Sequence, residues 1–263
     1  MSVESYLATV QRMVQWAIRD INRLIARVDM TDPDSARDAL QAELPTLISV
    51  WGEAAATVAA EYFEELIDAP AVLADPVDSE VVEGMVGWAV GPLYGELVPQ
   101  VDENGEPVLG DSGEPVVDKI PPDPAKAARN LQGASQRHIL NAGRDTVKQS
   151  AGSAGVGWAR VLQGETNCAL CVVMSSRGIV YESAESAGAQ TITDARVALG
   201  DRYHSFCDCA VIPCRDERDF PPGHDPEALY ELYMDARRNA DQMTLKGGDN
   251  NILTQMRKRH GMH

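Results

Sequence analysis

The sequence has few aromatic residues and no long apolar run. Aromatic side chains make up 5% of the 263 residues, whereas apolar residues as a whole make up 44%. A core of this composition depends on alanine and aliphatic side chains, which favours packed helices. No run of 18 or more apolar residues occurs, so we expect no transmembrane helix. The first ten residues include Glu4 and no basic residue, so we also expect no secretory signal and a reducing cytoplasm as the place of synthesis.

Basic residues are scarce in the N-terminal part. Residues 1–120 contain six Lys or Arg against 23 Asp or Glu, whereas residues 121–263 contain 17 of each kind. The net charge of −17 therefore lies in the N-terminal part. An acidic surface repels nucleic acid and suits a basic protein partner, although it can also serve solubility alone. We expect no specific nucleic-acid binding and no membrane contact.

Apolar periodicity predicts several long helices. Residues 3–29 repeat apolar side chains at steps of three and four, which is typical of an amphipathic helix. Pro33 follows a plausible cap and opens the second helix, and Pro45 is a possible bend within it. The predicted helices are residues 3–29, 34–68, 79–97, 124–151, 226–243 and 250–260.

Residues 99–124 carry a different pattern. An imperfect repeat with a period of nine residues contains Asn-Gly and Ser-Gly, which are turn signals. The segment therefore predicts a projecting hairpin or loop. Its acidic residues do not match the spacing of an EF-hand, which argues against a calcium loop.

The cysteines are few and clustered. All five lie between positions 168 and 214, and 32 residues separate a CxxC from an HxxCxC. Two short groups of thiol and imidazole ligands on these spacings suit one tetrahedral zinc ion. Because four protein ligands leave no open position, we expect a structural zinc. The candidate ligands are Cys168, Cys171, His204, Cys207 and Cys209.

The spacing does not decide which two residues of the HxxCxC motif complete the ligand shell. On a strand, Cys207 and Cys209 share one face, and His204 then lies outside the ligand shell. A turn at residues 205–206 instead brings His204 into the shell with Cys207 or Cys209. The slightly favoured set is Cys168, Cys171, His204 and Cys209, with Cys214 as a spare cysteine.

Other roles for the cysteines fit less well. An odd count argues against a complete disulfide framework, and a chain of this length can bury a core without disulfides. A redox CxxC expects a preceding strand, a helix that starts at the motif and an aromatic-Gly-Pro context. The CxxC here follows a glycine and lacks that context. Reduced cysteines buried in the core are the remaining alternative.

Residues 158–213 also carry a family resemblance. The segments are ETNCALC at 165–171, SRGIVY at 176–181 and YHSFCDC at 203–209. Their order and spacing resemble the C-terminal module of phage Mu F-like minor head proteins, whose last segment typically reads His-Pro-x-Cys-Arg-Cys. Here Ser205 replaces the proline and Asp208 replaces the arginine. The motifs cover about a fifth of the chain.

The resemblance implies a virion protein. Mu F-like proteins bind the portal inside the capsid, so the portal is the expected partner and the major capsid or scaffold protein a further one. The expected location is the capsid interior near the portal, after synthesis in the cytoplasm of the bacterial host. Related phage products are often labelled capsid maturation proteases, and this is the alternative function.

The sequence offers little for an enzyme. A serine protease would have to combine Ser175 or Ser176 with a histidine, and no Gly-x-Ser-x-Gly motif occurs. A cysteine protease on Cys168 or Cys207 would compete with metal binding by the neighbouring thiols. Glu182 and Glu185 do not form the Glu-x-Glu of ADP-ribosyltransferases. The candidate histidines are His138, His204 and His224.

The predicted fold class is therefore α+β. Long helices form the N-terminal part, and a small module with strands, held by zinc, precedes closing helices. Within that module the expected strands are residues 158–162, 178–181 and 203–213, with a helical turn or two in 183–199. The predicted domains are residues 1–98 (acidic and helical), 99–124 (hairpin or loop), 125–157 (helix and hinge), 158–215 (Cys/His module) and 216–263 (C-terminal helices).

Overall fold

A computed structural model describes most of the chain. The described residues are 1–75, 77–103, 105–110, 112–164, 167–179, 203, 206–240 and 251–262. The fold is mostly helical, with two small two-stranded sheets. Among the described residues, no helix combines the length and the apolar character that a membrane span requires.

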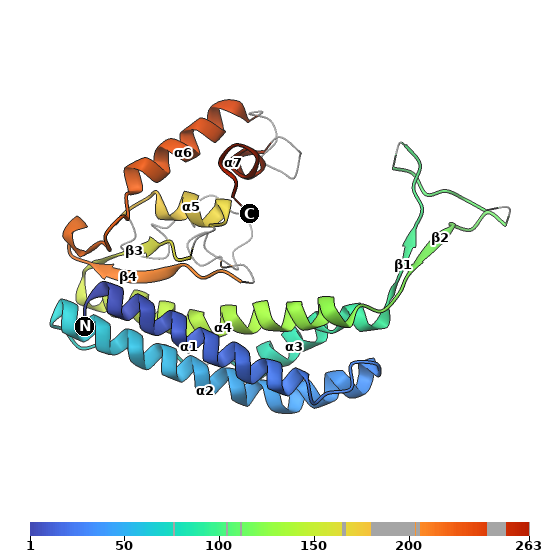
Figure 1. Cartoon of the computed structure of the whole chain (residues 1–263), viewed down its shortest axis with the longest axis horizontal. Coiled ribbons are helices and arrows are strands. Elements are labelled where there is room, and N and C mark those ends of the chain that lie inside the picture. The colour runs from blue at the N-terminus through green and yellow to red at the C-terminus, as the bar shows by residue number, and fades with distance from the viewer. Residues whose placement is uncertain are drawn as a thin grey trace.

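Long helices form the base of the molecule (Figure 1). Helices α1 (Val3–Ile25), α2 (Pro33–Ile67) and α4 (Pro124–Ala154) run alongside one another, and α3 (Ser79–Ala89) packs against α2 and α4. Their shared core is aliphatic and alanine-rich, as the scarcity of aromatic residues predicts. Leu40, Leu44 and Ile48 of α2 are fully buried within it.

Capping residues explain where these helices begin. The side chains of Ser2, Asp32 and Asp123 accept hydrogen bonds from the first-turn N–H groups of α1, α2 and α4. Proline occupies the first turn of α2 and α4, where its missing N–H has no helical partner to lose. Pro45 lies inside α2 without ending the helix.

The third helix is shorter than the predicted 79–97. It ends at Ala89, and a 3₁₀ turn, η1 (Gly91–Tyr94), follows it. Pro92 in this turn cannot donate a helical hydrogen bond, and Gly95 has a φ of 69°. The chain therefore leaves the helix here and enters a strand.

A hairpin arm projects from the bundle beyond this turn (Figure 1). Strands β1 (Glu96–Pro99) and β2 (Val117–Ile120) pair antiparallel, from Glu96 opposite Ile120 to Pro99 opposite Val117. The sequence repeat folds into two smaller turns at the tip, with bridges from Val101 to Pro107 and from Leu109 to Pro115. Gly105 and Gly113 adopt positive φ in these turns. The turn signals thus predict the arm correctly.

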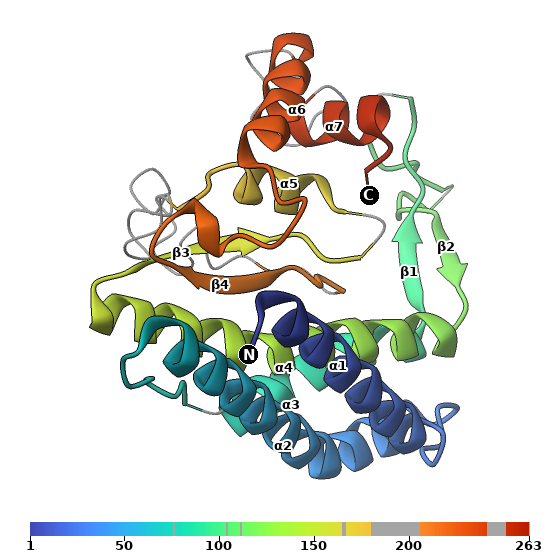
Figure 2. The ribbon, with the colours of Figure 1, turned by 60° about the vertical axis from the view of Figure 1, so that its left-hand side comes forward.

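The C-terminal module covers one face of the bundle. Strands β3 (Gly157–Val161) and β4 (Ala210–Cys214) pair antiparallel and lie on α4. Helices α5 (Ala169–Ser175), α6 (Pro226–Asn239) and α7 (Ile252–His260) lie beyond the strands (Figure 2), and a 3₁₀ turn, η4 (Glu217–Asp219), follows β4. One core runs from Tyr6 and Tyr62 of the bundle through this sheet to the cysteines.

The module differs from the predicted strands in three respects. Helix α5, which begins directly after Cys168, was not predicted. A strand was expected at 178–181, but residues 178 and 179 are not in a strand. Gly178 has a φ of 60°, which lies outside the extended region. Residues 180 and 181 lie outside the described residues. The third strand is shorter than 203–213 and starts at Ala210. The helical turns expected at 183–199 lie outside the described residues.

Candidate metal centre

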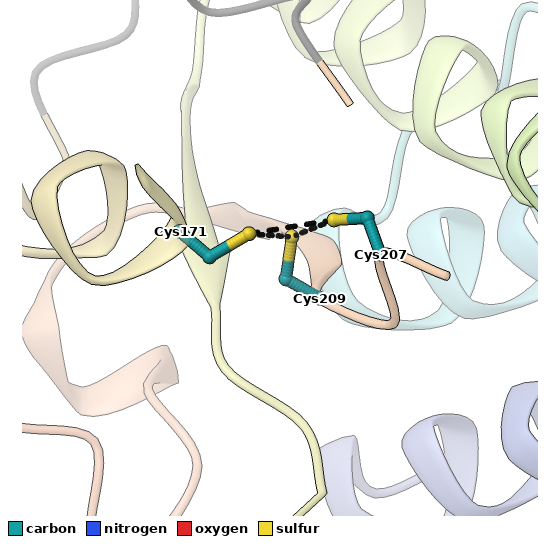
Figure 3. Close-up of side chains that lie close together, drawn as sticks. All are labelled: Cys171, Cys207 and Cys209. Carbon is teal, nitrogen blue, oxygen red and sulfur yellow. Dashed lines mark hydrogen bonds between the residues drawn. The ribbon is translucent and has the colours of Figure 1, made fainter. Parts of the chain in front are cut away.

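Three cysteine sulfurs lie together inside the C-terminal module. The Sγ of Cys171 is 3.4 Å from that of Cys207 and 3.5 Å from that of Cys209. The Sγ atoms of Cys207 and Cys209 are 3.0 Å apart, and all three side chains are buried (Figure 3). The cluster could hold a metal ion, because its three sulfurs converge on one point.

Two separate segments supply these sulfurs. Cys171 lies on α5, whereas Cys207 and Cys209 lie in the irregular segment that leads into β4 (Figure 3). Phe206, directly before this pair, has a φ of 62°, so the chain turns sharply there. The sulfurs of Cys207 and Cys209 lie 3.0 Å apart, so both side chains point to the same side of the segment.

The spacing of the sulfurs is close to that of a zinc site. A Zn–S bond of about 2.3 Å and tetrahedral angles place two ligand sulfurs about 3.8 Å apart. The observed separations of 3.0–3.5 Å are slightly shorter. A bound ion therefore requires the sulfurs to move apart by about 0.3 to 0.8 Å, most of all those of Cys207 and Cys209, which rotation about the Cα–Cβ bonds allows.

Cys168 adjoins the cluster. It is the N-cap of α5, and its Sγ accepts a hydrogen bond of 3.1 Å from the backbone N–H of Cys171. The Cys168 sulfur stands outside the group of three mutually close sulfurs, but its thiol interacts with that of Cys171. The CxxC motif is thus folded so that both of its sulfurs face the same region.

Hydrogen bonding among the thiols sets their pKa values in opposite directions. Hydrogen bonding to Cys168, then to Cys207 and Cys209, raises the pKa of Cys171. Hydrogen bonding from Cys171 and Cys209 lowers the pKa of Cys207, and the charge of Arg144 adds to this effect. For Cys209, hydrogen bonding to Cys171 lowers the pKa, but hydrogen bonding to Cys207 and burial outweigh it and raise the pKa to about 12. The three thiols therefore interact directly with one another.

Two buried arginines flank the cluster. Arg144 on α4 is 2% exposed and Arg160 on β3 is 1% exposed. The guanidinium carbons of Arg144 and Arg160 lie 3.8 Å and 4.1 Å from the centre of the Tyr203 ring. Although burial acts to lower the pKa of Arg160, Tyr203 and the thiols of Cys209, Cys171 and Cys207 raise it above its ordinary value. Both side chains therefore contribute positive charge to the surroundings of the thiols.

Sequence reasoning identified the cysteines but not these arginines. Four of the five candidate ligands are described and buried, and three of them form the cluster; His204 lies outside the described residues. The cluster contains both Cys207 and Cys209, between which the spacing could not decide. Cys214 lies apart on β4, where burial raises its thiol pKa to about 12.

A signal for Arg144 was present in the sequence. Leu140, Val147 and Ala151 are buried on one face of α4, and Arg144 stands between them at helical spacing. A charged residue inside an apolar stripe indicates a buried polar partner, because an isolated buried charge is costly. Arg160 offers a similar signal between buried neighbours on a short strand.

The candidate protease residues do not come together among the described residues. The hydroxyl of Ser175 is buried and has no hydrogen-bond partner in the described part of the chain. The hydroxyl of Ser176 donates to the carbonyl of Val173 at 2.9 Å. The His138 ring lies beside Arg137, and its pKa is lowered to about 4 by burial. The His224 ring packs edge-on against Phe220.

The fold and the cluster define a mostly helical protein that carries a small cysteine-centred module. The chain belongs to the VG15 protein family, which matches residues 1–236. It is similar to the "Gene 15 protein" of Mycobacterium phage D29, with 30% identity over 147 residues that cover 47% of this chain and 54% of the relative. The same-named protein of Mycobacterium phage L5 is 29% identical over 148 residues, which cover 46% of this chain and 49% of the relative.

These matches make the chain a bacteriophage protein and a homologue of the mycobacteriophage gene 15 proteins. The chain spans about half the length of the curated relatives it matches. No solved structure is significantly similar to it.

Proposed function

We propose that this protein is a Mu F-like minor head protein that binds the portal inside the phage capsid and has no catalytic activity of its own. The homology to phage gene 15 proteins and the Cys/His motif support a role in the virion. The observation that carries a binding role is the hairpin arm, because it exposes apolar side chains away from the body of the molecule.

The arm has the surface of a binding element. Leu97 is 65% exposed and Leu109 is 61% exposed, and further apolar side chains are exposed along the same ribbon. A two-stranded ribbon is marginally stable by itself, and clustered exposed apolar groups typically mark an interaction site. The exposed large apolar residues of the arm are Leu97, Val101, Val108, Leu109, Val117 and Ile120.

The acidic charge of the arm indicates a basic protein partner. Acidic residues are interspersed with the apolar ones, and the arm has a single basic residue, Lys119. Such a surface repels nucleic acid and complements a basic protein surface with an apolar centre. The described acidic residues of the arm are Glu96, Asp102, Glu103, Glu106, Glu114 and Asp118.

A structural zinc ion is the second element of the proposal. The described cluster supplies three thiol ligands, and the CxxC and HxxCxC motifs offer further candidates. Zinc bound by four protein ligands adds folding free energy rather than an open catalytic position. The ion would join α5 to the segment before β4 and so hold the parts of the module together.

Removal of the arm tests the binding role. Because Glu96 pairs with Ile120 at the base of the arm, a short Gly-Ser linker can replace residues 96–120 without separating the ends of the bundle. The purified protein is mixed with the portal protein of the same phage, and complex formation is measured by sedimentation or light scattering. We expect the intact chain to bind and the armless chain to remain folded without binding.

Point variants sharpen this test. The double variant Leu97→Ser and Leu109→Ser removes two exposed apolar groups from the arm. Val50→Ser, at an exposed valine of α2, is the matched control. We expect only the arm variant to weaken portal binding. No binding by the intact chain would contradict the proposal, and cleavage of scaffold or capsid protein by the purified chain would favour the protease alternative.

A further inference from the structure

We propose that the cluster binds zinc as a tetrathiolate completed by Cys168, and that Arg144 is the positioning residue that holds the Cys207–Cys209 segment and balances its charge. This inference rests on the structural zinc proposed above. Because Cys171, Cys207 and Cys209 already form the cluster, one ligand position remains among the candidates, and the inference assigns it to Cys168 rather than to His204.

The local geometry of the CxxC favours Cys168. The backbone N–H of Cys171 donates to the Cys168 sulfur at 3.1 Å. A backbone donor stabilises negative charge on its acceptor, as it does for sulfurs that bind metal. Cys168 is buried, and its thiol interacts with that of Cys171, which belongs to the cluster. Cys168 therefore places a fourth buried sulfur beside the three that already lie together.

Arg144 is placed to hold the other ligand segment. Its Nη2 donates to the carbonyl oxygen of Cys207 at 2.8 Å and to that of Cys209 at 2.7 Å. Its Nε donates to the carbonyl oxygen of Cys209 at 3.1 Å. The same Nη2 lies 3.8 Å from the Cys207 sulfur. One planar guanidinium thus fixes the backbone on which two ligands stand and faces one of the ligand sulfurs directly.

The charge around the cluster also favours four thiolates. Four thiolates and one divalent ion carry two net negative charges, whereas three thiolates with a neutral imidazole carry one. Arg144 and Arg160 bring two positive charges to the same buried region, where both guanidinium groups lie over the Tyr203 ring. Opposite charge beside a buried anionic centre lowers the free energy of that centre. The tetrathiolate matches this environment better than the mixed shell.

Ligand variants test the fourth ligand. Zinc content and zinc affinity are measured on the full chain by elemental mass spectrometry and by competition with a chromogenic chelator, and cobalt(II) absorption reports the number of thiolate ligands. We expect Cys168→Ser to lower the zinc affinity strongly and to weaken the thiolate–cobalt absorption. His204→Gln and the matched control Cys214→Ser should leave both unchanged. Zinc binding that survives Cys168→Ser but is lost with His204→Gln would overturn the inference while the zinc proposal stands.

Arginine variants test the positioning role. Loss of a partner that orients metal ligands typically costs about 10- to 100-fold in metal affinity, and we expect this loss for Arg144→Gln. Arg144→Lys keeps the charge but lacks the planar fork, so its zinc affinity should lie between that of the wild type and that of Arg144→Gln. Arg23→Gln, at an exposed arginine of α1, is the control. Far-UV circular dichroism establishes that each variant is folded.

The outcomes distinguish a failure of the positioning role of Arg144 from a failure of the structural zinc proposal. If Arg144→Gln does not fold, the comparison of Arg144→Lys with the wild type decides: weaker zinc binding supports the positioning role, and equal binding overturns it. Equal affinity in all folded arginine variants would overturn it as well. A wild-type chain that binds no zinc at all would remove both this inference and the structural zinc.

Discussion

Replacement of Gly143 by alanine tests how closely α2 and α4 approach each other. A Cβ atom at this position would lie 3.0 Å from the carbonyl oxygen of Ala55 and 3.4 Å from its carbonyl carbon. These atoms belong to the backbone of α2, so they cannot move aside as the end of a side chain does. Gly143 therefore allows the two helices to pack at this distance.

The expected magnitude follows from two opposing effects. Alanine in place of glycine inside a helix normally stabilises by about 1 kcal/mol. Extra volume in a close-packed contact costs about 1–3 kcal/mol. We therefore expect Gly143→Ala to lower the free energy of unfolding by about 1 kcal/mol, with a range from no change to a loss of about 2 kcal/mol.

Two other glycines provide controls on the same helix pair. A Cβ at Gly52 would meet Ala142 Cβ at an ordinary 3.6 Å, and a Cβ at Gly152 would meet nothing within 4 Å. Both alanine variants should gain up to about 1 kcal/mol. Urea unfolding followed by circular dichroism, at fixed zinc concentration, measures all three. A gain for Gly143→Ala as large as that for Gly152→Ala would refute the close approach of the helices.

Two further predictions concern titratable groups, one half-buried and one fully buried. Burial lowers the pKa of His138 from 6.5 to about 4, so below about pH 6.5 the unfolded chain binds a proton that the folded chain does not bind. The free energy of unfolding should therefore fall from pH 7 to pH 5, and it should fall less in His138→Gln. Urea titrations at each pH would measure both. An equal fall in both proteins would contradict the burial of His138. Burial also raises the pKa of Cys214 to about 12, so iodoacetamide at pH 8 should modify Cys214 only after denaturation. Peptide mass spectrometry would record the modification. Rapid modification of the native chain would contradict the burial of this thiol.

The long helices could be predicted because their signals are local. Apolar periodicity gave α1, α2 and α4 to within a few residues, and Asp32 with Pro33 marked the start of α2. The arm was predictable for the same reason, since its turns depend on glycines at fixed places in the repeat. Where one residue changed the local geometry against the pattern, as Pro92 did at the end of α3, the predicted helix was too long.

The metal centre was predictable only in part, because it depends on contacts between distant segments. The spacing of the cysteines indicated a cluster, and the structure brings Cys171 together with Cys207 and Cys209 across more than thirty residues. Spacing alone could not show that Cys168 caps a short helix, because seven residues carry too weak a periodic signal. The contact of Arg144 with the backbone of Cys207 arises from the packing of α4 against the module, which no local motif encodes.

Metal content is the most direct test of the central claim. The chain is purified without added metal and without a chelating affinity tag, then analysed by elemental mass spectrometry together with thiol counting before and after denaturation. The account predicts about one zinc ion per chain, with the cluster thiols protected until a chelator is added. A metal-free chain whose cluster thiols react freely in the native state would contradict it.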